Sequence, residues 1–520
     1  MLLFLLPAFA GEIITYSDDF ATDTGAWSAA GVVTDGVLVV SDGDAALGVT
    51  GAEQPDFFTL SARVRLTTMG TVTFGASGAE VTATIHPGDG SVTFGVDTLP
   101  LPMTHLAWAP EPDPVFEATG DAWEAGGINH PEVFRDDDGT WFLYYTAWWG
   151  PPGYGYRQIG LATSPDAITW TRYAGNPVLT IDYDLESVDG VHVHMPTVTK
   201  APDSTWHMYY SCYQNNFGNR ICHATSPDGY AWSPIGMAID KGAPGEFDEG
   251  SLRMPDVWIG RDGTWHLWYD GTDPEQHYGP TGYATIPDGY VWTKQGEILD
   301  FDHALQGLSV VESPYGLDVL YNKDDYFAHA AAQPEEPTTW AEEGSVLAKG
   351  WAWWNDGYIQ APTLWLDDTT YRMWFNGYTY TDGFERIGAA HTEPVPGTWL
   401  DVSLRWESGA MTLTVGGAER SFEVQNPGAI HFAATGTAEL DDVALTWVNL
   451  ESDTGDTGDT ADSGDSADSG DTASDSGASD CGCNGGGSPA AAGVGLALLA
   501  IARQGARSSR REAAARTVSG

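Results

Sequence analysis

Basic residues are scarce in this chain. It has 22 Lys and Arg against 73 Asp and Glu among 520 residues, a formal net charge of −51 at neutral pH. A chain this acidic repels polyanions, so we expect no nucleic acid partner. Long apolar stripes at helical spacing are also few, and the 63 Gly, 30 Pro and 22 Trp indicate short strands joined by many turns. The composition therefore predicts an all-β protein of roughly two to four domains.

Cysteine is scarce as well, and common catalytic motifs are absent. The sequence has four cysteines, with no zinc-type cluster, no P-loop, no dinucleotide fingerprint and no Gly-x-Ser-x-Gly nucleophile elbow. No motif requires a cofactor, and structural calcium stays open. Cys212 and Cys222 flank nine residues between two β-like segments. They are expected either to form a disulfide across a hairpin or to remain two buried thiols.

Both ends of the chain are predicted to be targeting segments. Residues 1–10 are apolar and end in a small-x-small triplet, which predicts a signal peptide, with a first buried strand as the alternative. Residues 451–480 hold ten acidic residues and no basic ones, which indicates an extended, disordered linker. Residues 481–520 combine Cys481-Gly-Cys483, a short apolar stretch and an Arg cluster. This order resembles the myxobacterial-type C-terminal sorting signal.

That resemblance implies processing and attachment at the cell surface. The apolar stretch is short for a permanent membrane span of about 20 residues. We therefore expect a secreted protein, associated with the cell surface or outer membrane, that contacts a membrane only through this tail.

An internal repeat fills residues 111–394. A Gly is followed five or six residues later by a Pro, as from Gly126 to Pro131, and then by a turn and an aromatic strand such as Trp141–Tyr145. Most copies close with a Pro-Asp turn before a Trp, as in Ser226–Trp232. Five copies follow one another at about 50 to 65 residues, the weak fourth one running from Gly307 to Glu312. The repeat predicts a five-bladed β-propeller.

This pattern resembles the five-bladed propeller glycosidases, the superfamily of arabinanases, β-xylosidases, invertases and levansucrases. The resemblance covers roughly residues 120–394 and implies a carbohydrate-associated propeller. In those hydrolases a carboxylate usually stands immediately before the strand-opening Pro. Here His130 takes that place in the first copy, and no copy has Asp-Pro. The resemblance therefore transfers no catalytic residue.

Residues 11–110 and 395–450 look like two pieces of one domain. Both alternate short β-like runs with Gly and Asp turns, and they resemble the edges of a laminin-G-like or concanavalin-like jelly roll. The first and last strands of such sandwiches pair, so a domain inserted between them is tolerated. The predicted fold is all-β, a five-bladed β-propeller inserted into a discontinuous β-sandwich. Two independent small β-domains are the alternative.

The residues around each repeated Pro are expected to line the central funnel. Because side chains alternate along a strand, those two and four positions before the Pro should face the funnel, and those one position before should pack between blades. His130 joins the binding candidates from the place of the family's carboxylate. Loops that leave the second strands add two aromatic platforms and an amide. The candidate sugar-binding residues are Asn129, His130, Trp148, Trp149, His192, His194, Arg253, Tyr358, Gln360 and Asn376.

Some of these residues have other readings. His192 and His194 lie two apart and offer two metal ligands, but no third ligand is identifiable, and hydrogen bonding to sugar hydroxyls or within the fold is the ordinary role. Arg253 suits the carboxylate of a uronic acid, or it neutralises a nearby acid.

Glycoside hydrolysis usually needs one protonated and one ionised carboxyl group. The candidates are Glu249 as the acid, with Asp270 or Asp189 as the base. Acidic residues beside Gly in such loops also commonly cap turns. The predicted function is that of an extracellular, monomeric glycoside hydrolase acting on a polysaccharide or oligosaccharide. A degenerate propeller that binds glycans without cleaving them is the alternative, and a scaffold that presents loops to another protein is a third.

Overall fold

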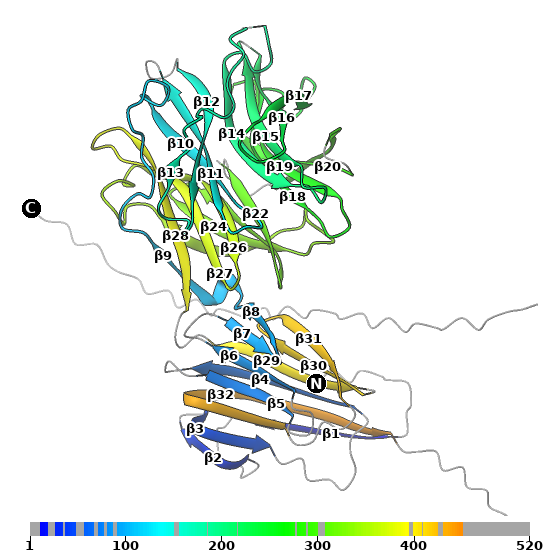
Figure 1. Ribbon diagram of the computed structural model, residues 1–520. Coiled ribbons are helices and arrows are strands. Elements are labelled where there is room, and N and C mark those ends of the chain that lie inside the picture. Colours follow the sequence, from blue (N-terminus) through cyan, green and yellow to red (C-terminus); the bar gives the residue numbers. More distant parts are fainter. Residues whose placement is uncertain are drawn as a thin grey trace, which may run out of the picture. The chain divides into compact units, whose positions relative to one another are not determined.

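The computed structural model confirms the all-β prediction (Figure 1). In the residues that it describes, the one helix is a 3-10 turn at Met103–His105, and no helix is long and apolar enough to cross a membrane. The predicted signal peptide, acidic linker and sorting tail lie outside the described residues. These are 11–18, 27–34, 37–47, 57–66, 71–76, 81–86, 91–149, 155–184, 186–215, 217–275, 278–287, 290–299, 307–394, 399–407, 409–424 and 430–450.

One antiparallel sheet combines strands from both flanks of the repeat. Strand β1 pairs with β32 from Gly11↔Leu450 to Asp18↔Val443, and β4 lies between β29 and β32. Its core includes Phe74 and Leu404, both fully buried. The twelve strands are β1 (Gly11–Asp18), β2 (Trp27–Thr34), β3 (Val37–Leu47), β4 (Phe57–Leu66), β5 (Thr71–Ala76), β6 (Val81–His86), β7 (Ser91–Phe94), β8 (Asp97–Pro100), β29 (Leu400–Glu407), β30 (Ala410–Val415), β31 (Ala418–Glu423) and β32 (Ile430–Leu450).

The repeat forms successive antiparallel units of four strands in a β-propeller-like arrangement (Figure 1). Units 1 and 2 share one sheet through a parallel contact between β12 and β14. Unit 1 is β10 (Gly127–Arg135), β11 (Trp141–Trp149), β12 (Tyr156–Ser164) and β13 (Thr171–Arg172); unit 2 is β14 (His192–Lys200), β15 (Trp206–Gln214), β16 (Gly218–Ser226) and β17 (Ser233–Ile239); unit 3 is β18 (Ser251–Ile259), β19 (Trp265–Thr272), β20 (Tyr278–Ile286) and β21 (Thr293–Leu299). Unit 4 is β22 (Leu308–Ser313), β23 (Gly316–Lys323), β24 (Tyr326–Ala332) and β25 (Ala341–Ala348); unit 5 is β26 (Tyr358–Asp367), β27 (Thr370–Tyr378), β28 (Glu385–Pro394) and β9 (Leu106–Pro110). Because β9 precedes unit 1 in the chain and completes unit 5, it ties the two ends of the repeat together.

Hydrogen bonds join unit 1 to unit 2, unit 3 to unit 4, unit 4 to unit 5 and unit 5 to unit 1 at the residue that follows the opening Pro, whose place Leu308 takes in unit 4. Glu132 accepts the N–H of Val198 at 2.8 Å, and Asp256 accepts the N–H of Val310 at 3.0 Å. Ser309 and Thr363 accept the N–H groups of Leu364 (3.0 Å) and Val133 (3.4 Å) in the same way. The last bond runs from unit 1 to unit 5. We call Glu132, Asp256, Ser309 and Thr363 the inner ring.

The Pro-Asp-x-x-x-Trp turns hold neighbouring units together through hydrogen bonds. In unit 2, Asp228 Oδ1 accepts two backbone N–H groups of the turn, each at 2.9 Å. The carbonyl of Gly229 in that turn accepts the hydroxyl of Tyr144 of unit 1 at 2.7 Å, and the carbonyl of Ala167 in unit 1 accepts the indole N–H of Trp374 of unit 5 at 3.0 Å. Most tryptophans of the repeat therefore serve the core and not a ligand.

Cys212 and Cys222 form a disulfide between β15 and β16, with Cα atoms 5.8 Å apart. Of the two alternatives that the sequence left open, the structure has the bonded one. The disulfide ties the second and third strands of unit 2 together.

Candidate functional site

Each unit opens on a strand that has one residue with left-handed backbone within it or, in unit 4, directly before it. The residues are those directly before the Pro, and a register shift accompanies them in units 1, 2, 3 and 5. Such a conformation costs roughly 1 kcal/mol for a residue with a side chain. The five φ values are 46° at His130, 55° at Met195, 49° at Met254, 94° at Gly307 and 51° at Ala361.

This irregularity corrects the predicted alternation. The extra residue breaks the period of two, so side chains one and two positions before the Pro both reach the axis. Met195, Met254 and Ala361 were expected to pack between blades, and instead they line cavities on the axis together with the binding candidate His130. The prediction assumed a regular strand, and a residue with left-handed backbone violates that assumption.

The same feature corrects the alignment of unit 4. The sequence pattern placed Glu312 at the position of the Pro. In the structure Ser309 pairs with Leu320, as Glu132 pairs with Tyr144 in unit 1. Gly307 is therefore the left-handed residue of unit 4, and Leu308 replaces the Pro.

A cavity of about 450 Å³, here called the axial cavity, lies where the first strands begin. A smaller space of about 30 Å³ lies on the other side of His130, Met195 and Met254, next to the prolines and the inner ring. These three side chains border both spaces and form a floor. Units 1, 2, 3 and 5 contribute the residues of the axial cavity, which are Asn129, His130, Arg157, His192, His194, Met195, Tyr213, Asn219, Arg253, Met254, Gln360 and Glu385.

Several buried polar atoms around the axial cavity have no hydrogen-bond partner among the described residues. They are Oδ1 of Asn129, both ring nitrogens of His130, and Nδ1 of His192 and of His194. The other ring nitrogen of His194 lies 3.0 Å from Asn219 Oδ1. Since buried polar groups in folded proteins are nearly always paired, a cluster of exceptions around one cavity indicates a place for a polar ligand.

The histidines of the axial cavity are neutral at physiological pH. Burial and the charges of Arg157 and Arg253 lower the pKa of His130 to about 3. Burial and Arg157 lower the pKa of His192 to about 4 and hold that of His194 well below its usual value. Neutral imidazoles both donate and accept hydrogen bonds, as sugar hydroxyls do.

Glu385 is the carboxylate of the axial cavity among the described residues, and the sequence analysis missed it. Its Oε2 accepts Asn129 Nδ2 at 2.6 Å, and its Oε1 accepts the hydroxyl of Tyr358. Burial raises the pKa of Glu385, while these donors and Arg157 oppose the rise. Tyr358 stacks on Tyr378 at 4.8 Å, and Tyr378 contacts Tyr380, which is 72% exposed. An aromatic path therefore runs from solvent to this carboxyl group.

A third repeated element could have revealed both Glu385 and Arg157. The third strands of units 1, 2 and 5 share an Ile, and two positions before it stand Arg157, Asn219 and Glu385. All three side chains line the axial cavity. Polar residues at one position of an otherwise apolar repeat are the signal.

Two of the predicted catalytic carboxylates lie outside the lining of the axial cavity. Glu249 Oε2 accepts the N–H of Gly245 at 2.7 Å, and Asp189 Oδ1 accepts the hydroxyl of Ser187 at 2.6 Å. Both cap turns within their own loops, which is the alternative that the sequence offered.

Asp270, the third predicted carboxylate, occupies a structural position of the repeat. Its Oδ2 accepts the N–H of Gly307 at 2.9 Å, just as Thr146 accepts Met195 (2.9 Å) and Ser211 accepts Met254 (3.3 Å). Burial raises the pKa of Asp270 to about 7, while Gly307 and the facing Arg253 oppose the rise. It does not line the axial cavity, although it borders Arg253, which does.

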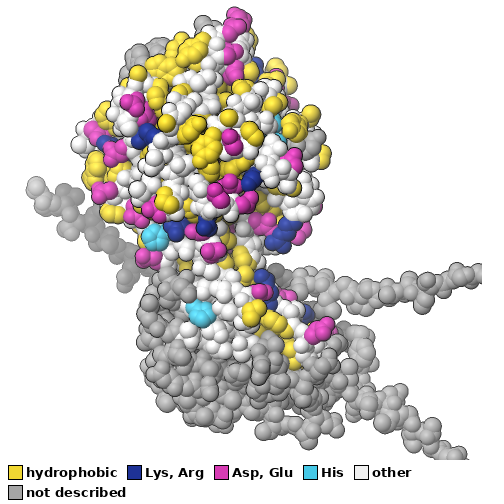
Figure 2. All heavy atoms as spheres, viewed as in Figure 1, with side chains coloured by type: hydrophobic (Ala, Val, Ile, Leu, Met, Phe, Trp, Pro, Cys, Tyr) yellow, Lys and Arg dark blue, Asp and Glu magenta, His cyan; other side chains and the backbone are white. Residues whose placement is uncertain are grey.

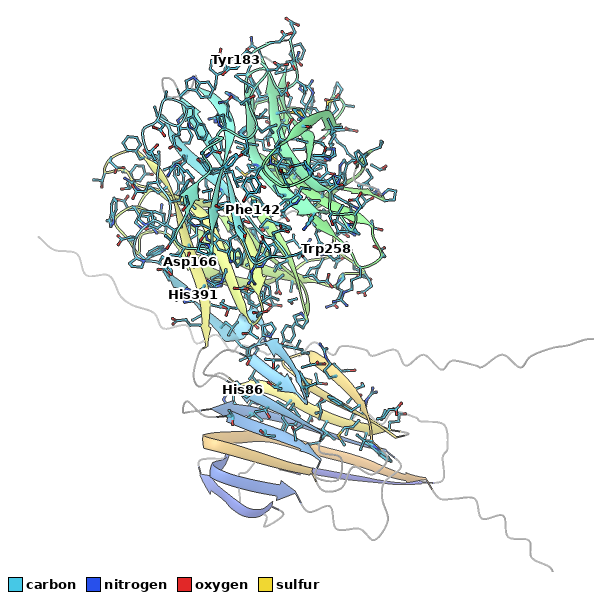
Figure 3. The ribbon with its side chains drawn as sticks, viewed as in Figure 1. His86, Phe142, Asp166, Tyr183, Trp258 and His391 are labelled. Carbon is cyan, nitrogen blue, oxygen red and sulfur yellow. A yellow bond between two sulfur atoms is a disulfide. The ribbon has the colours of Figure 1, made fainter. Side chains whose placement is uncertain are left out.

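The predicted aromatic platforms lie differently from one another. Trp148 covers Gly126 and Gly127, and a Cβ on either glycine would overlap its ring. Trp149 is half-buried and contacts Tyr156 at 5.4 Å. Tyr156 in turn contacts Tyr183 at 6.1 Å, and Tyr183 is 63% exposed at the end of the units opposite to His391 (Figure 3). Tyr183 therefore offers the exposed ring that Trp148 does not.

The remaining amide candidate, Asn376, is fully buried and pairs in register with Gln360. Its side-chain oxygen and nitrogen have no hydrogen-bond partner among the described residues. It lies close enough to Glu385 to help hold the pKa of that carboxyl down.

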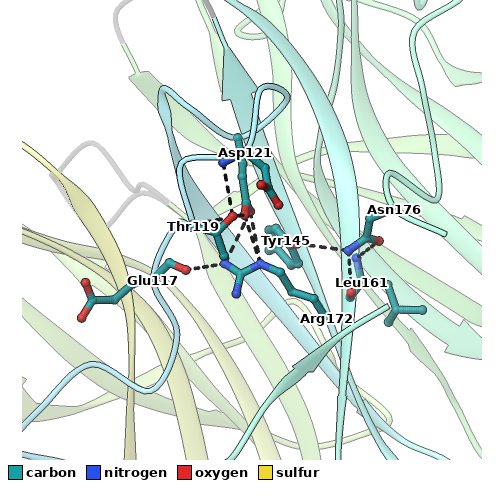
Figure 4. A network of polar contacts seen from close by, with 8 residues as sticks. Glu117, Thr119, Asp121, Tyr145, Leu161, Arg172 and Asn176 are labelled. Atoms are coloured by element: carbon teal, nitrogen blue, oxygen red, sulfur yellow. Dashed lines mark hydrogen bonds and ion pairs between the residues drawn. The ribbon is translucent and has the colours of Figure 1, made fainter. Parts of the chain in front are cut away.

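The buried carboxylate of Glu124 is satisfied by the fold. Glu124 accepts the backbone N–H of Thr119 at 3.1 Å and pairs with Arg172 at 3.1 Å, within a network that also holds Asn176 and Tyr145 (Figure 4). Across the part of the chain that the structure describes, no group of three or more His, Cys, Asp or Glu is placed to hold a metal ion.

Comparisons with known proteins give weak similarities. No family model matches the chain, and no curated protein does. A family 117 glycoside hydrolase of the marine bacterium Zobellia galactanivorans is 14% identical, with 57% of this chain and 92% of that chain covered and a TM-score of 0.45. A putative glycosidase from Bacteroides thetaiotaomicron is 16% identical over 55% of this chain and 96% of that one, with a TM-score of 0.43. An N-acetylgalactosamine deacetylase from F. plautii is 15% identical over 55% and 95%, with a TM-score of 0.43. Likeness at this level assigns neither an activity nor a residue.

Proposed function

We propose that this chain is a carbohydrate-active protein that binds an oligosaccharide or polysaccharide in the axial cavity and hydrolyses a glycosidic bond there. The observation that carries the proposal is the cluster of buried, unpartnered polar atoms on Asn129, His130, His192 and His194. Sugar hydroxyls donate and accept at once, so they match neutral imidazoles and amides. Exposed tyrosines beside the cavity suit the C–H faces of further sugar rings.

The proposed architecture is a five-bladed propeller inserted into a split sandwich. The pairing of β9 with β28 and the bond from Val133 to Thr363 support a closed ring of units. The pairing of β1 with β32 supports one flanking domain made from both ends of the folded body. Secretion and attachment at the cell surface remain part of the proposal on the strength of the sequence.

The proposed acid is Glu385, in place of the predicted Glu249. Burial favours the protonated carboxyl, and Asn129 and Tyr358 fix its orientation. Protonated Glu385 gives its proton to the leaving glycosidic oxygen as the bond to the anomeric carbon breaks. Water then adds to that carbon and loses a proton to a base. His192, with an unpartnered Nδ1 and a pKa of about 4, is a base of carboxylate strength.

Glu385→Gln tests this proposal, with Glu336→Gln, at an exposed carboxylate of unit 4, as the matched control. Products are followed by mass spectrometry after incubation of the full chain with plant, algal and bacterial polysaccharides. We expect wild type and the control to release oligosaccharides, and Glu385→Gln to be slower by at least about 100-fold, the usual contribution of a general acid. Equal rates in wild type and Glu385→Gln would refute the assignment.

Glycan binding without cleavage is the second candidate. Glu385 is the sole carboxylate among the described residues that line the axial cavity, whereas glycosidases normally use two. This candidate predicts saturable binding of a glycan by folded wild type with no product from any polysaccharide. Release of product by wild type would exclude it.

A further inference from the structure

The axial cavity is positively charged within a strongly acidic protein. Its described lining includes two guanidinium groups, Arg157 and Arg253, and one carboxylate, Glu385. The whole chain, in contrast, has 73 Asp and Glu against 22 Lys and Arg. Carboxylates are spread over the visible face of the described surface in Figure 2. The concentration of arginine in the axial cavity is therefore a local feature and not a consequence of composition.

Arg157 carries a positive charge that no bonded acidic group of the described residues neutralises. It lies near the start of β12, half-buried, where β12 meets His192 of β14. Its backbone pairs with Trp148 of β11, but its guanidinium group makes no hydrogen bond or ion pair with any residue that the structure describes. Burial lowers the pKa of this guanidinium and Glu385 opposes the effect, but arginine stays charged in proteins. A buried charge without a partner is unfavourable, so an anion in the cavity would stabilise it.

The neighbouring acidic groups do not cancel this charge. Glu385 lies near Arg157 and opposes the lowering of its pKa, but burial raises the pKa of Glu385 itself, so its negative charge is reduced. Below the floor, Glu132 and Asp256 accept backbone N–H groups of the inner ring, and burial raises the pKa of both, so their negative charge is reduced. Asp270 faces Arg253 from the next strand, which leaves Arg157 as the charge that is not balanced.

We propose that the axial cavity recognises a sugar with an anionic substituent, a carboxylate or a sulfate ester, through Arg157 assisted by Arg253. This inference rests on the proposed glycan function of the same cavity. The planar guanidinium presents two parallel N–H groups, which match two oxygens of a carboxylate or a sulfate. The nearby neutral histidines and amides are then left for the hydroxyls of the same sugar ring.

Isothermal titration calorimetry on the full chain tests the inference with three oligosaccharides of equal length: an oligogalacturonate, a sulfated galactan fragment and a neutral galactan fragment. We expect at least one anionic probe to bind at least 10-fold more tightly than the neutral one. The carboxylate and sulfate arms identify which anion the cavity prefers.

Arg157→Gln and Arg157→Lys locate the effect. Arg157→Gln should weaken binding of the preferred anionic probe by 10-fold or more, and by a clearly larger factor than it weakens binding of the neutral probe. Arg157→Lys keeps the positive charge but loses the two parallel N–H groups of the guanidinium. Its affinity for the anionic probe should therefore lie between that of wild type and that of Arg157→Gln. Arg405→Gln, at a half-exposed arginine of β29, is the control and should match wild type. If Arg157→Gln does not fold, the affinities of wild type for the anionic and neutral oligosaccharides still test whether the protein prefers an anionic sugar.

Equal affinity for neutral and anionic probes, or unchanged anionic binding in folded Arg157→Gln, would overturn the inference while leaving a neutral glycan function intact. Anionic binding without product release would support the inference and favour the non-catalytic candidate. Binding of none of the probes would overturn the inference together with the proposed function.

Discussion

The inner ring and the axial cavity belong to the same strands and differ in how their polar groups are satisfied. Glu132 of the inner ring accepts a backbone N–H and two hydroxyls from neighbouring units. Asn129 and His130, three and two residues earlier, leave polar atoms without partners. Within one repeat, a polar group bonded by the next copy serves assembly, whereas an unpartnered group a few residues away is available to a ligand.

The largest expected effect concerns stability. Glu132→Ala removes the acceptor of Val198 N–H and of two hydroxyls, so we expect a loss of about 2–4 kcal/mol in the free energy of unfolding. Gln360→Ala, at a lining residue of the axial cavity, should cost less than about 1 kcal/mol. Urea unfolding of both variants measures the difference. Equal losses in the free energy of unfolding would show that the inner ring contributes no more to stability than the lining of the axial cavity.

The two regions should also respond to pH with opposite signs. Burial raises the pKa of Glu132 from 4.5 to about 7, so between these values the folded state holds more protons than the unfolded state and stability falls as pH rises. The pKa of His192 falls from 6.5 to about 4, so over that window the unfolded state holds more protons and stability falls as pH drops.

Glu132→Gln should therefore reduce the loss of stability from pH 5 to 7, and His192→Gln should reduce the loss from pH 6.5 to 4. Each change should amount to about 1–3 kcal/mol, since one pKa unit corresponds to about 1.4 kcal/mol. Urea midpoints measured at several pH values give both curves. Curves parallel to wild type for both variants would contradict the burial-based account.

A smaller effect is expected at the edge of the axial cavity. Tyr380→Ala removes the exposed end of the aromatic path and should weaken binding of longer oligosaccharides by about 3- to 10-fold, with no loss of stability. Tyr173→Ala, next to outer strand β13, is the matched aromatic control. Titration with oligosaccharides of increasing length would show the loss. An equal loss with Tyr173→Ala would mean that the aromatic path does not contact sugar.

The smallest effects are expected from two carboxylates that the sequence favoured. Glu249 and Asp189 cap their own loops outside the lining of the axial cavity, so Glu249→Gln and Asp189→Asn should change product release by less than about 2-fold. Initial rates on the best polysaccharide measure this. A 100-fold loss of rate in either variant would return the catalytic role to the loop that holds the substituted carboxylate.

The sequence allowed the all-β fold and part of the site to be predicted. The Trp-bearing turns and aromatic strands are local patterns with strong turn chemistry, so the repeat was visible. Polar residues recur at a fixed distance from each Pro, and this pattern predicted that Asn129, His192 and His194 face the centre of the repeat. All three line the axial cavity. The rest of the site was hidden for two physical reasons.

First, the left-handed residues have no sequence signal. Glycine is the usual mark of that conformation, but His130, Met195 and Met254 adopt it, and only the surrounding fold imposes it. Second, Arg157 and Glu385 reach the cavity from third strands, whose alignment was not part of the pattern used. Their signal is a polar residue two positions before the Ile that the third strands of units 1, 2 and 5 share, and spacing from the repeated Pro does not include it.

A crystal structure of the Glu385→Gln protein with a bound oligosaccharide is the most direct test of the claim that the axial cavity is the glycan site. The account predicts a sugar ring above the floor of His130, Met195 and Met254, with hydroxyls bonded to Asn129 Oδ1 and His194 Nδ1. An oligosaccharide bound only elsewhere, with the axial cavity left to water, would contradict it.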